Sequence, residues 1–139
     1  MQLELARKIA DGAVAHAQKM GIFSLAIVIL DAGGNIKYSL AQDNAGSLRH
    51  SIALAKANAA IGMGMSTGQL FEIFENGILP DRFSAAISAL SPQGFAPQPG
   101  GELVNQHGRL VGAVGISGAS SLQDESVARA AIDQAIRAV

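Results

Sequence analysis

The sequence predicts a single α+β domain over residues 1–139, in which helices pack on an antiparallel sheet. Its 139 residues suit one domain with a moderate core, and no repeat, low-complexity tail or linker divides them. Two strand-like runs, at 24–30 and 36–41, are separated by a glycine-containing turn, which is typical of a β-hairpin. Amphipathic or alanine-rich segments with helical spacing lie on both sides of this hairpin. These three observations favour the α+β class.

Hydrophobic spacing also gives the order of the elements along the chain. Helices are predicted at 2–20, 47–62, 66–75, 82–89 and from 122 onward. Strands are predicted at 24–30, 36–41, 103–106 and 109–116, with tight turns at 31–35 and 107–108 and an irregular proline-rich crossing at 91–101. Helix caps are expected from Asn44 or Ser47, from Ser66 or Thr67, from Asp81, and from Ser120 with Gln123 or Ser121 with Asp124.

The composition excludes several classes of protein. A net charge of -1, an aromatic content of 4% and the lack of a basic run argue against a nucleic-acid binder. Cysteine is absent, so the chain has no disulfide and no thiol nucleophile. No apolar run reaches the ~18 residues of a membrane helix, and the charged helical start is not a signal peptide. We therefore expect a cytoplasmic protein without membrane contact. Its mean hydropathy of +0.29 favours a homo-oligomer that covers apolar surface.

The stretch from Gly108 to Val139 is predicted to form a buried strand, a glycine-serine elbow and a closing helix. The elbow has little side-chain bulk, so a ligand or another backbone segment can approach it closely. Its N–H groups and those of Gly100 and Gly101 would suit a carboxylate near the helix N-terminus. We therefore take Gly100, Gly101, Ser117 and Gly118 as candidate ligand-binding residues. Close packing of helix on sheet explains the same glycines equally well.

Four stretches of the chain resemble one protein family. They are AIVILDAGGNI (26–36), SIALAKANAA (51–60), PQPGGELV (97–104) and VGAVGISGASSLQDESVARAAI (111–132). Together they resemble the GlcG/HbpS-like family, also called the heme-degrading or DUF336 family, which includes the C-terminal domain of PduO-type proteins. The resemblance implies a profilin-like α/β sandwich with an antiparallel sheet of about five strands, often in higher oligomers. It also implies heme or a corrinoid-related ligand in some members, whereas others occur beside enzymes of small-acid catabolism.

The histidines are the candidate iron ligands, because heme iron accepts imidazole nitrogen readily. His16 lies on the apolar side of the first predicted helix, and heme-binding relatives use a histidine in that region. The alternative is a partly buried structural histidine or a subunit contact. Arg49 and His50 could meet heme propionates or form a solvated first turn of their helix. His107 is most simply a turn residue, and the three histidines lack the spacing of a zinc site.

Lys56 and Asp124 are the candidate catalytic residues. Lys56 is a cation in an alanine-rich helix, where it could pair with Asp31 or Asp124, hold a substrate carboxylate, or cover apolar surface with its stem. Asp124 and Glu125 fall in the first turn of the last helix, where carboxylates offset the helix dipole. The alternative is that Asp124 faces the elbow and acts as a general base.

Three hypotheses about function follow. The first is a small oligomeric protein that binds heme or a related tetrapyrrole, with His16 as the axial iron ligand and Arg49 or Lys56 meeting propionates. The second is an enzyme acting on a small oxo- or hydroxy-acid, with Lys56 binding the carboxylate and Asp124 moving a proton. The third is a purely structural assembly subunit. The sequence leaves open whether the protein is an enzyme.

Overall fold

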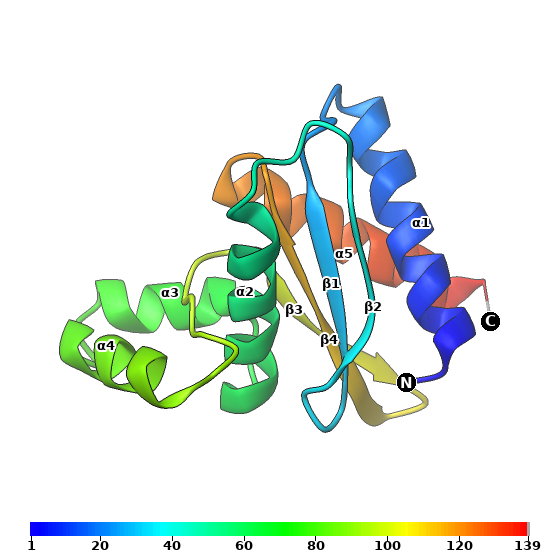
Figure 1. The fold of residues 1–139 in the computed structure, drawn as a ribbon. Helices are drawn as coiled ribbons and strands as arrows, with labels where there is room; N and C mark the ends of the chain where they lie inside the picture. The colour runs from blue at the N-terminus through cyan, green and yellow to red at the C-terminus, as the bar shows by residue number, and fades with distance from the viewer. Residues whose placement is uncertain (139) are drawn as a thin grey trace.

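A computed structural model describes residues 1–138 and contains five helices and four strands. The helices are α1 (Leu3–Lys19), α2 (Arg49–Met63), α3 (Thr67–Glu75), α4 (Asp81–Leu90) and α5 (Ser121–Arg137). The strands are β1 (Ala26–Asp31), β2 (Ile36–Ala41), β3 (Gly101–Gln106) and β4 (Arg109–Ser117). The predicted α+β class is therefore correct, and each predicted helix and strand has a counterpart (Figure 1).

The strands form one antiparallel sheet in the order β2-β1-β4-β3. Two hairpins, β1–β2 and β3–β4, meet along β1 and β4, so the two strands richest in buried residues lie at the centre. The sheet has four strands within residues 1–138, whereas the family resemblance implied about five. The physical reason is that the crossing at 91–101 holds three of the four prolines, which cannot donate to a strand ladder.

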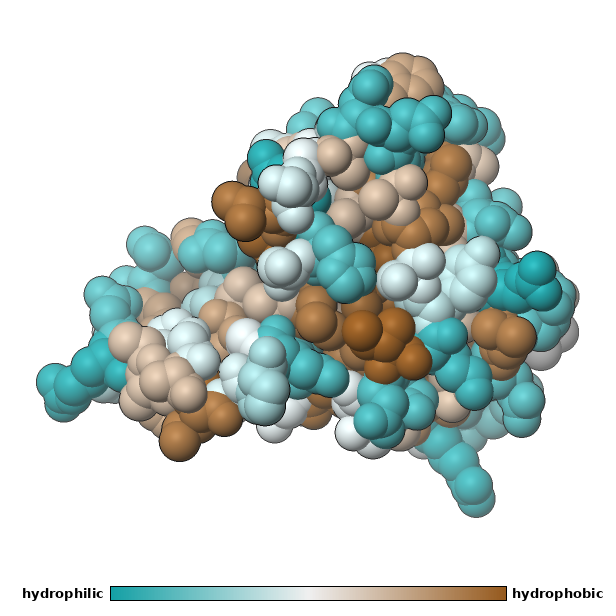
Figure 2. All heavy atoms as spheres, in the orientation of Figure 1, coloured by the Kyte–Doolittle hydropathy of each residue, from teal (hydrophilic) through white to brown (hydrophobic). Residues whose placement is uncertain are grey.

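Helices cover the sheet on both faces (Figure 1). On one face, α1 and α5 lie against each other and against the sheet, and their shared core includes Ile9, Ile27 and Val127. On the other face, α2 packs across β4, β1 and β3, with alanines Ala53, Ala57 and Ala60 in its core. Small alanine side chains allow the α2 backbone to lie close to the strands. Figure 2 shows apolar side chains gathered between α2 and the β2 edge of the sheet.

Helices α3 and α4 form a lobe that extends beyond the sheet (Figure 1). The Phe74 ring lies 6.4 Å from that of Phe83 and 6.5 Å from that of Phe95, so one aromatic cluster joins both helices to the proline-rich crossing. No residue of α4 is fully buried. The lobe therefore depends on few interactions compared with the rest of the fold.

The predicted caps are partly correct. Ser120 with Gln123 and Ser66 with Gln69 both form capping boxes, at the starts of α5 and α3. At α2 the prediction was wrong. Leu48 occupies the N-cap without a side-chain bond, because Arg49 N–H donates instead to the Gly46 carbonyl, 3.0 Å away.

Two further details of the predicted elements are settled. Pro80, not Asp81, is the N-cap of α4, and Asp81 lies in its first turn. The turn at 31–35 forms as expected, with the Asp31 carboxylate accepting N–H bonds from Gly33 and Asn35 at 3.0 Å each. Over residues 1–138, no helix is both long enough and apolar enough to cross a membrane.

Candidate functional site

Lys56 and Asp124 form a buried ion pair at the end of the sheet where α5 begins. The Lys56 Nζ lies 3.0 Å from the Asp124 Oδ2, and the two side chains are only 3% and 2% exposed. Lys56 also donates to the Ile116 carbonyl at 2.9 Å. Lys56 could have paired with Asp31 or Asp124, and the structure selects Asp124. The pair joins α2 to both β4 and α5.

Both carboxylate oxygens of Asp124 are occupied. Oδ2 accepts from Lys56, and Oδ1 accepts the Ala119 N–H at 3.0 Å. Burial lowers the pKa of Lys56, and the neighbouring Asp124 charge opposes that shift. Two of the three N–H donors of Lys56 are used by Asp124 and the Ile116 carbonyl, and the side chain is buried, so a ligand carboxylate has little access to it. The geometry therefore ties the elbow to α2, whereas catalysis by either residue stays a prediction.

The glycines of the site lie against neighbouring backbone. Gly100 has φ +127°, and a Cβ there would lie 2.8 Å from both the Ile116 carbonyl oxygen and the Lys56 Nζ. The Gly101 N–H donates to the Thr67 Oγ1 at 2.7 Å. A Cβ on Gly118 would meet the Ser24 carbonyl. Close packing, one of the two explanations offered by the sequence, thus accounts for these glycines. Their role in ligand binding is an untested prediction.

Arg49 is brought to the elbow by the first turn of α2. It is half-buried, and its guanidinium donates to the hydroxyl of Ser117 at 3.3 Å, while Ser117 itself is 1% exposed. His50, the next residue, is exposed. The elbow therefore combines a cationic side chain with Ser117 and the start of α5.

His16 lies elsewhere in the fold. It is half-buried in the last turn of α1, in the helix layer shared with α5, whereas Arg49, His50 and Lys56 belong to α2 on the other face. His107 is exposed at the tip of the β3–β4 hairpin, with φ +53°. The structure thus groups Arg49, Lys56, Ser117 and Asp124 at one end of the sheet, and it places His16 in a different layer.

Sequence reasoning overlooked Glu102. This residue of β3 is 7% exposed, its Oε1 accepts from the Arg129 Nε at 2.9 Å, and its Oε2 is buried without a hydrogen-bond partner in the structure. Burial raises the pKa of Glu102, and the Arg129 bond opposes that rise. The signal was present, because strand alternation puts Glu102 on the same face as the buried Val104.

The described residues also set limits on ligands. Within residues 1–138, no group of three or more histidine, aspartate or glutamate side chains could hold a metal ion by itself.

An open groove of about 460 Å³ runs between α1 and β2, with Val14, Phe23 and Leu40 among its lining residues. Its size falls within the range of small-molecule sites.

Comparisons with known proteins agree with this fold. Residues 1–133 match the family described as "Haem degrading protein HbpS-like". The structure is similar to HbpS, with 28% identity, a TM-score of 0.81, and coverage of 96% of this chain and 89% of that chain. It is also similar to PduOC in complex with heme, with 26% identity, a TM-score of 0.83, and coverage of 96% and 93%.

A third similar structure is the DUF336 protein ORFY from Klebsiella pneumoniae. It has 24% identity and a TM-score of 0.86, with coverage of 100% of this chain and 92% of that chain, and it bears on the fold alone. A search of curated proteins finds no significant match. The family match over nearly the whole chain, with the same fold in these structures, leads to one conclusion: this chain belongs to the HbpS-like (DUF336) family.

Proposed function

We propose that this protein binds heme or a closely related tetrapyrrole, and that it does so as a homo-oligomer. One observation carries the proposal: the structure overlaps almost completely with PduOC, a relative solved as a heme complex. Membership of a family described as heme-degrading supports the same ligand class. When bound, heme would supply an iron centre for ligand binding or redox chemistry.

Two side chains of this chain are of types that could hold heme, an imidazole and a guanidinium. His16 is our proposed axial ligand, since its imidazole is a suitable iron donor and is half-buried in α1. Arg49 is our proposed partner for a propionate, because its bond in the structure is to the neutral hydroxyl of Ser117. A guanidinium has five donors, so Arg49 can bind a carboxylate as well. Lys56 is the weaker choice, since Asp124 already neutralises it.

His50, Gly100, Gly101 and Gly118 complete the proposed binding residues around Arg49 and Ser117. His50 is exposed beside Arg49 and would add a second polar group. Because His16 and Arg49 lie in different helix layers, one heme that touched both would have to reach around the sheet end or lie between two chains. The roles of His16 and Arg49 therefore need separate tests.

The proposal predicts a saturable change in the Soret band when hemin is added to the purified protein. We expect His16→Ala to weaken binding or to change the spectrum, because the axial nitrogen is lost. His107→Ala is the matched control, since His107 lies on an exposed hairpin tip. Wild-type protein without a saturable change would contradict heme binding. Identical spectra for wild type and His16→Ala would contradict only the ligand assignment.

The alternative is an enzyme that acts on a small oxo- or hydroxy-acid. The specific observation behind it is the 3.0 Å distance between the Lys56 ammonium and the Asp124 carboxylate at the glycine elbow. Lys56 would bind the substrate carboxylate and Asp124 would transfer a proton. This chemistry requires the buried pair to open first. Full turnover by an Asp124→Asn variant would exclude the role of Asp124.

A further inference from the structure

We infer that α4 is a lid that opens as a unit of its own, while α2, α3 and the sheet stay packed. It turns about hinges near Gly77 and Ser91, on either side of the helix. Opening uncovers Phe74 and Phe95, the rings against which the α4 side chains pack in the closed structure. This motion requires neither heme nor a second copy of the chain.

Few apolar contacts hold α4 in place. None of its residues is buried, and Phe83 and Ile87 are half-buried. The Phe83 ring lies 6.4 Å from the Phe74 ring of α3, and Ile87 packs against the cluster that contains Leu70 and Phe95. The closed position of α4 therefore depends mainly on two side chains.

Polar contacts add little to this hold. The Ser88 hydroxyl donates to the Phe95 carbonyl at 3.3 Å, which is long for a hydroxyl donor. Asp81 and Arg82 are exposed, and neither forms an ion pair within residues 1–138. The N-cap Pro80 gives no side-chain bond to the first turn. Since isolated helices shorter than ~12–15 residues are marginal in water, α4 with its 10 residues loses its support when it leaves the lobe.

The chain is fixed firmly on both sides of α4. Before it, the first turn of α3 is tied to the sheet, because the fully buried Thr67 accepts the Gly101 N–H at 2.7 Å. After it, the Asn58 amide donates to the Ser91 hydroxyl at 2.8 Å and to the Gly94 carbonyl at 2.7 Å. The segment between these anchors, which contains α4, can therefore move without them.

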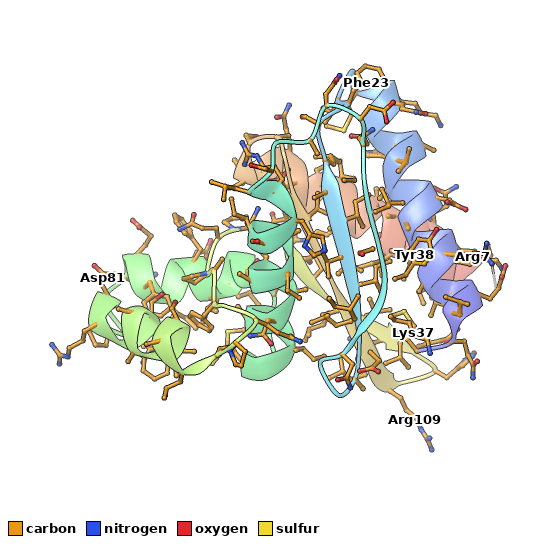
Figure 3. The ribbon with its side chains drawn as sticks, viewed as in Figure 1. Arg7, Phe23, Lys37, Tyr38, Asp81 and Arg109 are labelled. Carbon is orange, nitrogen blue, oxygen red and sulfur yellow. The ribbon has the colours of Figure 1, made fainter. Side chains whose placement is uncertain are left out.

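Gly77 supplies the hinge between α3 and α4. Its φ of +71° is in the left-handed region that glycine adopts without strain, and a Cβ there would meet nothing within 4 Å. The Ile78 N–H donates to the Ile73 carbonyl at 3.0 Å, which closes the end of α3 before the chain turns. Ile78 is 70% exposed, so its side chain does little to hold the turn. Figure 3 shows Asp81, the first residue of α4, at the end of the lobe far from the sheet.

Opening leaves an apolar recess on the lobe where Phe83 and Ile87 are seated in the closed state. The Phe74 and Phe95 rings, 6.5 Å apart, lie outside α4 and keep their contact. Met65 is also part of this cluster, and methionine adapts its shape readily to a new neighbour. A molecule that took the place of Phe83 and Ile87 would need apolar groups of similar size. The closed α4 thus blocks the recess with side chains of its own.

Limited proteolysis with trypsin tests the opening on the full chain. A protease cuts a helix only when the helix opens, so the cleavage rate follows the population of the open state. We expect cleavage after Arg82 of α4 to be at least about tenfold faster than after Lys8. Lys8 is a matched control, because it is also exposed but lies in α1, which buries Leu5 and Ile9. Urea below the unfolding transition should hardly change the rate at Arg82, since opening α4 exposes little surface.

Two variants of α4 test its hold on the lobe. Ile87→Ala should raise the rate of cleavage after Arg82 by about tenfold, because the closed state loses a packed side chain. Leu90→Ala is the matched control, since it shortens a side chain of the same helix that is 78% exposed. Its cleavage rate should stay within about twofold of wild type.

Hydrogen exchange followed by mass spectrometry defines which segment opens. The amides of α4 should exchange at least about tenfold faster than those of α3, and Ile87→Ala should accelerate α4 alone. Equal exchange in α3 and α4, cleavage after Arg82 no faster than after Lys8, or an Ile87→Ala variant that is cut like wild type would each overturn the inference. These measurements contain no heme, so failure of the proposed function would leave their outcome unchanged.

Discussion

Lys56 and Asp124 form a buried ion pair, in which each charge compensates the other. Breaking such a pair by removing one charge leaves the other unpaired in a dry environment. We expect Asp124→Asn to lower the free energy of unfolding by about 3–5 kcal/mol, because Lys56 is 3% exposed. Asparagine keeps an oxygen for the Ala119 N–H, so the effect isolates the charge. Urea unfolding followed by circular dichroism measures it.

Two further variants test whether the unpaired buried charge causes the loss of stability in Asp124→Asn. Asp133→Asn is an exposed change on the same helix and should stay within about 0.5 kcal/mol of wild type. Lys56→Met combined with Asp124→Asn should recover part of the loss, since no buried charge remains. If Asp124→Asn and Asp133→Asn unfold alike, the pair does not stabilise the fold.

Ionisation of Glu102 makes the free energy of unfolding depend on pH. Burial raises the pKa of Glu102 above its ordinary value of 4.5, so the folded state favours the protonated form. Its contribution to stability is therefore present below about pH 4.5 and is lost as the pH rises through the raised pKa. We expect Glu102→Gln, which cannot ionise, to gain stability over wild type as the pH rises from 4.5 toward 7.5. Urea unfolding at several pH values measures the difference.

The matched control for this pH effect is Glu75→Gln, an exposed glutamate on α3. Its difference from wild type should stay flat over the same pH range. A flat difference for Glu102→Gln as well would show that ionisation of Glu102 does not affect folding.

Residue roles were only partly accessible from the sequence. Lys56 was conspicuous as a lone cation among alanines, but its partner was ambiguous, because Asp31 and Asp124 both suited it. The choice depends on which helix end lies over which strand, and no local pattern contains that information. Glu102 was missed because it lies just before the strand predicted at 103–106, so its alternation with the buried Val104 was not used.

At the scale of elements, glycine sets the distance between α2 and the sheet. A Cβ on Gly115 would collide with the Ala53 carbonyl of α2 and would lie 2.8 Å from the Ala57 nitrogen. We expect Gly115→Ala to destabilise the fold by about 1–3 kcal/mol, because the helix must move away from β4. Thermal or urea unfolding measures the loss.

Gly62 is the matched control for Gly115. It lies within α2, and a Cβ there would meet nothing within 4 Å. Gly62→Ala should therefore stabilise the protein by about 0.5–1 kcal/mol through higher helix propensity. Equal effects of the two substitutions would contradict close packing as the reason for Gly115.

The sequence predicted the start of a helix well where a side chain close by in the sequence caps that helix. The capping boxes of α3 and α5 need only residues three apart, so Ser66 and Ser120 were identified correctly. The start of α2 is fixed instead by a backbone turn that bonds Arg49 to Gly46, which no side-chain pattern announces.

At the scale of the whole molecule, the two hairpins and the α+β class followed from spacing and turn residues. The order β2-β1-β4-β3 did not, because it depends on the pairing of β1 with β4, in which Ile27 lies opposite Ile116, 89 residues further along the chain. Such pairing is decided by the fit of two hydrophobic strands within a complete core, not by local preference.

One helix layer combines α1 with α5, the first and last elements of the described chain. During synthesis, a nascent chain that has emerged only as far as β4 can form both hairpins and place α2, yet one side of its sheet stays partly bare. Ile27, Val114 and Ile116 then face water until α5 leaves the ribosome. Apolar strands that are left uncovered during folding are prone to aggregate, so the packing of α5 removes this hazard.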